Sequence, residues 1–273
     1  MNINLLKNSI IFNWEKDYHL SKLLQSFQNK VEIRFVGGCV RNAFLGQKIN
    51  EIDFAINIVP SEIIKILNKN NIEYDQQGIK FGTIKAIIKD KNYEITSLRK
   101  DTYKNSRFPD VEFINDWQLD SLRRDFTINS IYISLNKEIF DYHDGLNDLR
   151  ENRILFIGKA EKRIEEDYIR IIRFYRFLSF FEFPKYNLKD LHMLNNVMHK
   201  IEDHVSNNKI KSELKKILNN PFPKNSLVSL DQDNIERKNK LIKYIQALWE
   251  KDDYKEGLNN CLKKINYLIN NLK

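Results

Sequence analysis

The sequence predicts an α+β protein in which a small mixed β-sheet with helices is followed by an all-helical remainder. Up to about Phe140, short apolar runs rich in β-branched residues alternate with helical patterns. After about Glu151 the strand signals fade, and apolar residues recur at three- and four-residue steps. Pro221 and Pro223 interrupt that helical pattern, which predicts a hinge at residues 219–225.

The first part of the chain reads as strands covered by helices. An amphipathic helix is expected over residues 14–29, and Ser61 is placed to cap a second helix that runs to about Asn70. The runs that we expect to form strands are residues 33–36, 52–58, 80–89, 93–98 and 128–135. Together they predict a mixed sheet with helical cover.

The second part is expected to be helical throughout. A continuous apolar stripe predicts one helix over residues 164–179, which Pro184 should end. The residues of this stripe are Ile164, Tyr168, Ile171, Ile172, Tyr175, Leu178 and Ser179. Further helices are expected over residues 189–201, 209–218 and 235–249.

Two features near residue 40 could together hold a phosphate group and a metal ion. The first strand ends in Gly37 and Gly38, and glycine lets a phosphate approach the backbone N–H groups that begin the next helix. Glu51 and Asp53 follow at i and i+2 of a strand, so their carboxylates can face one side and bind Mg²⁺. Taken alone, each feature is more often an ordinary turn or a solvated strand face.

Four motifs, in one order and spacing, make accidental occurrence improbable. They are Gly37-Gly38-x-Val40-Arg41, Glu51-x-Asp53, Arg123-Arg124-Asp125-Phe126-Thr127-Ile128-Asn129 and Glu166-Asp167-x-x-Arg170-x-x-Arg173. Supporting segments lie at residues 78–83, 93–99, 106–113 and 141–149. From about Phe35 to about Leu218 the chain resembles the class II tRNA nucleotidyltransferase family, which contains the CCA-adding enzymes and the bacterial poly(A) polymerases.

The resemblance implies three functional regions. These are a catalytic nucleotidyltransferase head at residues 1–150, a helical neck that recognises the base at residues 151–218, and a helical body that contacts tRNA at residues 219–273. Members of the family usually carry a longer body, so a short one is expected here. Such a body would hold full-length tRNA more weakly, accept tRNAs with reduced arms, or rely on Lys209, Lys211, Lys215 and Lys216 for binding. Alternatively, the substrate is the same as that of the longer members.

The activity that the resemblance implies is the addition of C, C and A to the 3′ end of tRNA from CTP and ATP, without a nucleic-acid template. The 3′-hydroxyl attacks the α-phosphorus in line, and two metal ions stabilise the entering and leaving oxygens. Glu51 and Asp53 would be the metal ligands. Glu94 is a candidate third catalytic carboxylate, with an ordinary surface Glu as the alternative.

Glu51 departs from the family, which normally has Asp at both positions of the acid pair. The additional methylene moves the carboxylate, and Mg²⁺ demands near-ideal octahedral geometry. The exchange could therefore slow catalysis or favour Mn²⁺ over Mg²⁺, without abolishing metal binding.

The remaining motif residues are expected to bind the nucleotide. Gly37, Gly38 and Arg41 would hold the triphosphate, the arginine through charge-assisted hydrogen bonds. The resemblance assigns Arg124 to nucleotide binding, with Asp125 and Asn129 orienting it or the ribose. A salt-bridged helix start would account for one Arg-Asp pair in this run.

Base choice is expected to reside in the second part of the chain. Asp167 and Arg170, at i and i+3 of the predicted helix, would present an acceptor and a donor fork on one face. C and A offer an exocyclic amine and a ring acceptor to this pair, whereas U and G offer the opposite groups. Arg173 and Arg176 would continue toward the phosphates or hold Asp167. An exposed ion pair is the alternative.

Composition adds weaker expectations. The formal net charge of +8 over 273 residues favours RNA as a partner, although an AT-rich genome also produces a basic composition. Cys39 and Cys261 should be buried or inert thiols, and the five histidines show no zinc spacing. With no signal sequence and no long apolar run, we expect a cytoplasmic protein that binds neither membrane nor DNA.

One further resemblance, one further departure from the family and three alternative functions complete the expectations. The loop at residues 99–113 resembles the lever with which the family switches from C to A addition, and Lys209 replaces a usual arginine. A partial adding enzyme and a poly(A) polymerase stay open within the same class. A non-catalytic RNA-binding derivative stays open as well, because of Glu51 and the short body. The oligomeric state does not follow from the sequence.

Overall fold

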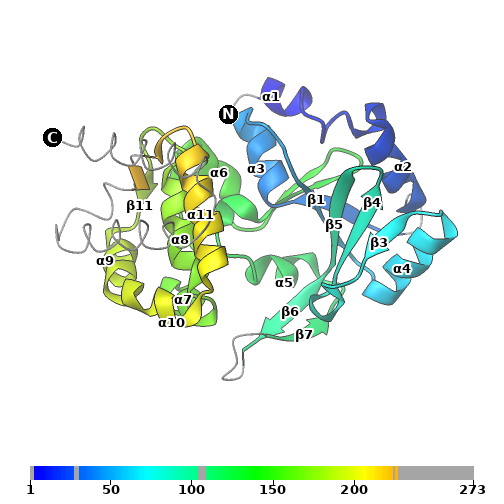
Figure 1. Cartoon of the computed structure of the whole chain (residues 1–273). Helices are drawn as coiled ribbons and strands as arrows, with labels where there is room; N and C mark the ends of the chain where they lie inside the picture. The colour runs from blue at the N-terminus through cyan, green and yellow to red at the C-terminus, as the bar shows by residue number, and fades with distance from the viewer. Residues whose placement is uncertain (1–2, 28–30, 104–108, 224, 227–273) are drawn as a thin grey trace, which may run out of the picture. The chain divides into compact units, whose positions relative to one another are not determined.

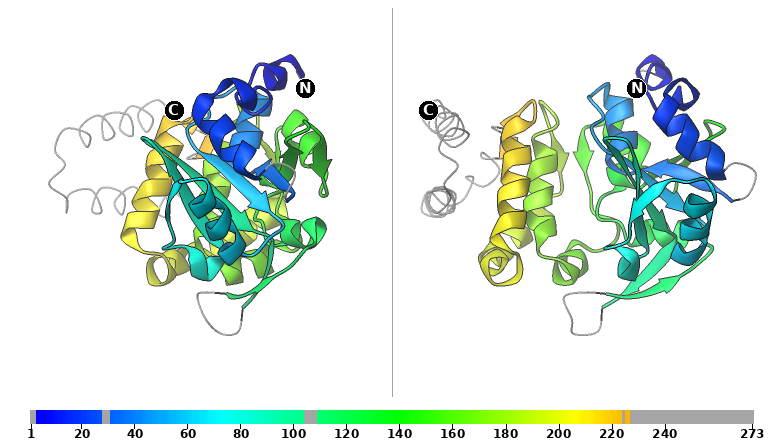
Figure 2. Two further views of the ribbon diagram at one scale, coloured as in Figure 1. Left: turned by 90° about the vertical axis from the view of Figure 1, so that its right-hand side faces the viewer. Right: turned by 45° about the vertical axis from the view of Figure 1, so that its right-hand side comes forward.

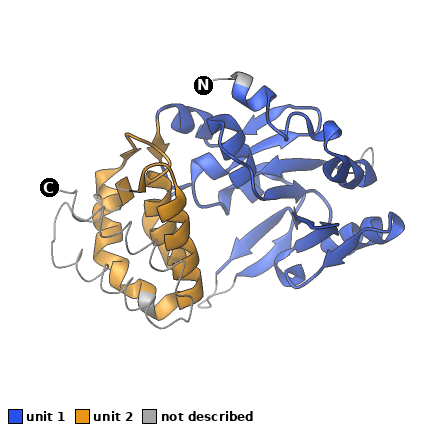
Figure 3. Cartoon of the chain, turned by 45° about the horizontal axis from the view of Figure 1, so that its top comes forward, with its two compact units in different colours: residues 1–151, 155–158 blue, residues 152–154, 159–273 orange. Residues whose placement is uncertain are grey.

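The computed structural model describes residues 3–27, 31–103, 109–223 and 225–226, which fall into two compact units. The head unit comprises residues 1–151 and 155–158, and the helical unit comprises residues 152–154 and 159–273 (Figure 3). The predicted helix at residues 235–249, Cys261 and most of the predicted body lie outside the described residues.

A seven-stranded mixed sheet forms the centre of the head unit (Figure 1). Its strands, in spatial order, are β3 (Glu73–Asp75), β4 (Thr83–Ile88), β5 (Lys91–Ser97), β2 (Ile52–Ile56), β1 (Ile33–Val36), β8 (Ile131–Ser134) and β9 (Ile139–Asp141). β2 and β5 are parallel, and all other neighbours in this sheet are antiparallel. The predicted mixed sheet is confirmed.

Helices pack on this sheet because its central strands β1, β2 and β8 are largely apolar and buried on both faces. The rings of Phe35 and Phe54 lie 4.9 Å apart, and their chain neighbours Val36 and Ala55 belong to a buried cluster with Trp117. Alternation along a strand places these two sets on opposite faces. The described α-helices of the head are α1 (Ile3–Lys7), α2 (Tyr18–Phe27), α3 (Gly38–Leu45), α4 (Pro60–Lys69), α5 (Trp117–Leu122) and α6 (Gly145–Arg150). Of these, α2, α3 and α4 contact strands of the sheet, α1 packs on α3, and Trp117 of α5 belongs to the buried cluster.

The segment at residues 99–113, expected as a loop, begins and ends as a strand. β6 (Arg99–Thr102) and β7 (Asp110–Phe113) pair antiparallel in a separate ribbon (Figure 1). The four residues of β6 are all polar and β7 has only two apolar ones, a pattern too weakly apolar to indicate strands from the sequence. Residues 104–108, between the two strands, lie outside the described residues.

Four predictions about element boundaries in the head are wrong for local reasons. The described part of the helix predicted at residues 14–29 divides into the 3₁₀ helix η1 (Trp14–Lys16) and α2, because Asp17 accepts a hydrogen bond from the N–H of Leu20 at 2.9 Å and starts a new helix. Ser61 is not a cap, since α4 already begins at Pro60. Two predicted strands open with the 3₁₀ helices η2 (Ile79–Phe81) and η3 (Thr127–Asn129).

The helical unit consists mainly of short helices. They are α7 (Ala160–Glu166), α8 (Ile169–Leu178), α9 (Leu188–Val197), the 3₁₀ helix η4 (Met198–Lys200), α10 (Ile201–His204) and α11 (Asn207–Asn219). α8 and α11 lie side by side (Figure 2). A two-residue parallel pair, β10 (Arg153–Ile154) with β11 (Lys185–Tyr186), was not predicted because strands this short leave no periodic pattern.

The predicted continuous helix at residues 164–179 is wrong in two places. It is interrupted at Asp167, whose φ of −159° and ψ of 108° are extended values. It also ends at Leu178, well before Pro184. Ser179 and Asn220 explain this end, since both bind the carbonyl oxygen of Arg176, at 2.6 and 3.2 Å.

Among the helices that the structure describes, none combines the length and the apolar character needed to cross a membrane.

Gly145 provides a test of the close packing in the head. It is the first residue of α6, and a Cβ there would lie 2.3 Å from the carbonyl oxygen of Thr127. We expect Gly145→Ala to lower the free energy of unfolding by about 2–3 kcal/mol, because backbone must move to admit the methyl group. Urea denaturation measures this change.

Gly38→Ala is the matched control, because Gly38 is likewise the first residue of a helix, α3. There a Cβ would meet only the Nη2 of Arg41, at an ordinary 3.7 Å. Equal losses in the two variants would contradict the packing argument.

Candidate nucleotide and metal site

The glycine turn between β1 and α3 allows other groups to come close to its backbone. Gly37 has a φ of +78°, which a residue with a side chain rarely adopts, and α3 begins at the next residue. A Cβ on Gly37 would lie 3.7 Å from Oδ2 of Asp53 and 4.0 Å from Nη1 of Arg124. The turn therefore lies beside a carboxylate and a guanidinium, with the N-terminus of α3 next to both.

Strand pairing fixes the position of Asp53. In the antiparallel β1–β2 pair, Val36 is opposite Asp53, and in the parallel β2–β5 pair Asp53 is opposite Glu94. Glu51 immediately precedes β2 and is exposed. Two of the three predicted carboxylates are thus neighbours across strands, and the third is two residues from Asp53 along the chain.

The electrostatic surroundings of Asp53 are divided between like and opposite charges. Burial, together with the charges of Glu94 and Glu51, raises the pKa of Asp53 to about 6, although Arg124 and Arg41 act in the opposite direction. The carboxylate is costly to ionise in the free protein, and a bound cation would reduce that cost.

These side chains fit a divalent ion. Carboxylate oxygens are the ligands that Mg²⁺ prefers, and it commonly uses one or two of them together with substrate phosphates and water. In the described part of the chain, no group of three or more His, Cys, Asp or Glu side chains is arranged to hold a metal. Glu51 and Asp53 match the arrangement with only two protein carboxylates, in which substrate phosphates and water supply the other ligands.

Arg41, Asn129 and Asp125, all predicted to bind nucleotide, form one hydrogen-bonded chain. Nη1 of Arg41 donates to Oδ1 of Asn129 at 2.5 Å, and Nδ2 of Asn129 donates to Oδ1 of Asp125 at 3.2 Å. Arg41 is only 6% exposed, and its Nη2 donates to Asn42 at 2.9 Å. The guanidinium is therefore held in place from α3 and η3.

Arg124 is held by two partners, Tyr132 and Asp120, neither of which the sequence analysis identified. Its Nε donates to the hydroxyl of Tyr132 at 3.0 Å, and its Nη2 lies 3.3 Å from Oδ2 of Asp120. Asp120 lies four residues before Arg124, a spacing at which opposite charges meet on a helix. This four-residue spacing in the sequence could have indicated that Asp120 is a partner of Arg124.

The helical unit corrects the predicted geometry of Asp167 and Arg170. Asp167 directly follows α7 in an extended conformation, and Arg170 lies in the first turn of α8, so the two are not on one helical face. Oδ1 of Asp167 accepts from the N–H of Ile169 at 3.2 Å. An aspartate that binds backbone N–H groups ahead of it favours a new helix start over a continued helix.

Two of the three predicted arginines of the helical unit, Arg170 and Arg176, form ion pairs within that unit. Nη1 of Arg170 lies 2.7 Å from Oε2 of Glu166, and Arg170 is only 8% exposed. Nη1 of Arg176 lies 3.0 Å from Oε2 of Glu213, a buried residue of α11 that the sequence analysis did not identify. The guanidinium of Arg173 lies 6.0 Å from the ring of Phe177. Roles of these residues in nucleotide binding stay predictions.

The thiol of Cys39 is buried beneath the glycine turn, as predicted. Its Sγ lies 3.2 Å from the carbonyl oxygen of Val36. Burial, with the charge of Asp53, raises the pKa of this thiol to about 12.

Comparison with known proteins agrees with this geometry. Residues 33–155 match the family described as "Poly A polymerase head domain". The crystal structure of the Bacillus stearothermophilus CCA-adding enzyme in complex with CTP aligns at a TM-score of 0.69 and 26% identity, covering 86% of this chain and 59% of that one. The fold is the nucleotidyltransferase head fold.

Sequence relatives lead to the same family. The human "CCA tRNA nucleotidyltransferase 1, mitochondrial" is 42% identical over 147 residues, which are 54% of this chain and 34% of that protein. The CCA-adding enzyme of Leuconostoc citreum is 34% identical over 228 residues, 82% of this chain and 53% of that protein. Residues 33–155 belong to the poly(A) polymerase head-domain family, and the relatives named CCA-adding enzyme or CCA tRNA nucleotidyltransferase confirm the resemblance that the motifs predicted. The chain spans between about a third and about half of the length of these relatives.

The buried thiol gives a test of this part of the structure. In a Cys261→Ser variant, Cys39 is the only cysteine. We expect it to resist a thiol reagent at about pH 8, because a buried thiol with a raised pKa supplies almost no thiolate. Absorbance after addition of a chromogenic disulfide measures the reaction.

The same variant in concentrated guanidinium chloride is the control, since unfolding should expose one thiol per chain. Rapid reaction of the native variant would show that the glycine turn does not cover Cys39.

Proposed function

We propose that this chain acts as a CCA-adding tRNA nucleotidyltransferase, which adds C, C and A to the tRNA 3′ end from CTP and ATP without a nucleic-acid template. The observation that carries the proposal is the meeting of the Gly37 turn, the Asp53 carboxylate and the Arg124 guanidinium in the head unit. These groups supply what a metal-bound triphosphate requires. The matched relatives, which bear the names of CCA-adding enzymes, support it.

In the head, each predicted residue has a chemical role in this reaction. Glu51 and Asp53 would hold Mg²⁺ or Mn²⁺, which when bound supplies charge for the entering and leaving oxygens and lowers the pKa of the 3′-hydroxyl. The backbone N–H groups that begin α3 at Gly38 donate to the triphosphate. Glu94 adds negative charge beside Asp53.

The basic residues of the head would complete the nucleotide site. Arg41 donates to the triphosphate. Asn129 and Asp125 hold Arg41 by the hydrogen bonds that join all three. Arg124, beside the same turn, binds the nucleotide.

In the helical unit, Asp167 and Arg170 would choose the base from two separate elements. The exposed carboxylate of Asp167 accepts from the exocyclic amine of C or A, and the guanidinium of Arg170 donates to a ring acceptor. The break between α7 and α8 sets the spacing of the two groups in place of a helical face. Arg173 and Arg176, also predicted to bind the nucleotide, add positive charge to the same unit.

The regional assignment belongs to the same proposal: a catalytic head at residues 1–150, a base-recognising neck at residues 151–218 and a tRNA-contacting body at residues 219–273. α11 carries lysines that suit a phosphate backbone, and the exposed ones are Lys209, Lys215 and Lys216. We place the reaction in the cytoplasm, although the human relative is named as mitochondrial.

A poly(A) polymerase is the second candidate, favoured by the description of the matched head family. A partial adding enzyme would use the same head. A non-catalytic RNA-binding protein is the candidate from another class, because Glu51 stands where the family has Asp.

Nucleotide incorporation distinguishes these candidates. Purified protein is incubated with a tRNA transcript that lacks CCA, and with each nucleoside triphosphate singly and together. We expect C, C and then A to be added, with U and G disfavoured by about 1–3 kcal/mol for each unsatisfied base contact. The length and composition of products on a sequencing gel give the result.

Long A tracts without C would indicate the polymerase, and a product that stops after CC or that gains only A would indicate a partial adding enzyme. Incorporation of U as readily as C would contradict base choice by Asp167 and Arg170. Binding of tRNA with no incorporation in Mg²⁺ or Mn²⁺ would support the non-catalytic alternative.

The acid pair is tested by two exchanges. We expect Asp53→Asn to reduce incorporation by about a thousandfold or more, since an amide is a poor metal ligand at this position. Glu51→Asp should retain activity and shift the preference from Mn²⁺ toward Mg²⁺, because the shorter side chain restores the usual ligand length. Rates in each metal are the measurement.

Asp75→Asn, at the end of edge strand β3, is the control for loss of a carboxylate from the same sheet, and should leave incorporation unchanged. Full activity of Asp53→Asn would rule out its role as a metal ligand.

A further inference from the structure

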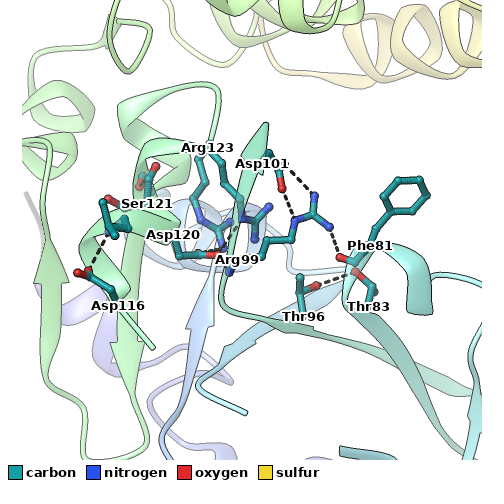
Figure 4. A network of polar contacts seen from close by, with 12 residues as sticks. Phe81, Thr83, Thr96, Arg99, Asp101, Asp116, Asp120, Ser121 and Arg123 are labelled. Carbon is teal, nitrogen blue, oxygen red and sulfur yellow. Dashed lines mark hydrogen bonds and ion pairs between the residues drawn. The ribbon is translucent and has the colours of Figure 1, made fainter. Parts of the chain in front are cut away.

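Asp120 is a buried carboxylate that none of the predicted functions uses. It lies on α5, is 0% exposed and accepts from four donors (Figure 4 shows it beside Arg99 and Arg123). A buried charge is expensive unless it is paired and fully hydrogen-bonded. This one is retained with a complete set of partners, which indicates that its surroundings are organised around it.

The two carboxylate oxygens of Asp120 serve different parts of the head. Oδ1 accepts from the backbone N–H of Arg99 at 3.1 Å, where β6 begins, and from Nε of Arg123 at 2.8 Å. Oδ2 accepts from the hydroxyl of Tyr132 at 2.9 Å and from Nη2 of Arg124 at 3.3 Å. The second oxygen therefore faces the arginine that lies beside the glycine turn.

The contacts at Oδ2 fix the direction of the Arg124 side chain. Nη2 of Arg124 binds Asp120, while its Nε donates to the Tyr132 hydroxyl, which in turn donates to Asp120. With these two nitrogens engaged, Nη1 lies 4.0 Å from the Cβ position of Gly37. Asp120, Tyr132 and Arg124 thus form a triangle in which each is hydrogen-bonded to the other two, and Arg124 also lies beside the glycine turn of the candidate site.

Charge favours the same arrangement. Burial alone would raise the pKa of Asp120, but the charges of Arg123 and Arg124 outweigh it and hold that pKa below its usual value. The carboxylate is therefore ionised at neutral pH. An ionised, buried acceptor keeps the guanidinium oriented before a ligand arrives, which lowers the cost of ordering it on binding.

We propose that Asp120, acting with Tyr132, is a positioning residue that aims the Arg124 guanidinium at the nucleotide bound beside Gly37. The proposal rests on the proposed function, because that function assigns Arg124 to the nucleotide. Asp120 itself does not touch the reacting atoms.

Tyr132→Phe is the gentlest test, because it removes one hydroxyl from the triangle and leaves the buried charge paired. We expect the KM for CTP to rise about tenfold with kcat changed less than about threefold, as for loss of a charge-assisted hydrogen bond that acts in binding. Asp120→Asn should raise KM further where the variant folds. Steady-state kinetics with a tRNA lacking CCA, and the rise in melting temperature caused by CTP alone, are the two readouts.

Tyr142→Phe is the matched control. Its hydroxyl accepts from a buried guanidinium too, Nη1 of Arg34 at 3.1 Å, and its ring lies 6.0 Å from that of Tyr132. Both exchanges should lower the melting temperature to a similar degree, and only Tyr132→Phe should weaken CTP binding.

Equal KM values in the two tyrosine variants would overturn the positioning role and leave the proposed function intact. Wild-type protein that neither incorporates CTP nor is stabilised by it would refute the proposed function, and the positioning role with it.

Discussion

The antiparallel pairing of Val36 with Asp53 is the constraint on which the candidate site depends. Because β1 ends at Val36, the glycine turn and the start of α3 must lie beside the carboxylate of Asp53. A shift of one residue in this register would turn Asp53 to the opposite face of the sheet. One strand pair thus brings together the backbone that we propose binds phosphate and the acid that we propose binds metal.

Opposing charges are then arranged around Asp53. Glu94, opposite it on β5, and Glu51 repel it, while Arg41 and Arg124 attract it. Neither arginine depends on a nucleotide for its orientation, since Asn129 holds one and Asp120 with Tyr132 holds the other. The site therefore offers both signs of charge in fixed positions, which suits a ligand that is itself a metal-bound polyanion.

The sequence was sufficient for the parts of this arrangement that are local. Strand periodicity predicted the sheet, the glycine pair predicted the turn between β1 and α3, and motif order predicted the family resemblance. The break at Asp167 was not predictable from the apolar stripe, which continues through it on both helices. Asp120 and Glu213 were missed because a buried acid resembles an exposed one until its partners are known. Their burial depends on tertiary packing, which periodicity does not report.

A crystal soaked with CTP and Mn²⁺ tests the central claim most directly, because the anomalous signal locates the metal without reference to activity. The account predicts a manganese peak bonded to the carboxylate of Asp53, with the triphosphate lying along the Gly37 turn and the first N–H groups of α3. A metal bound elsewhere, or phosphates remote from that turn, would contradict it.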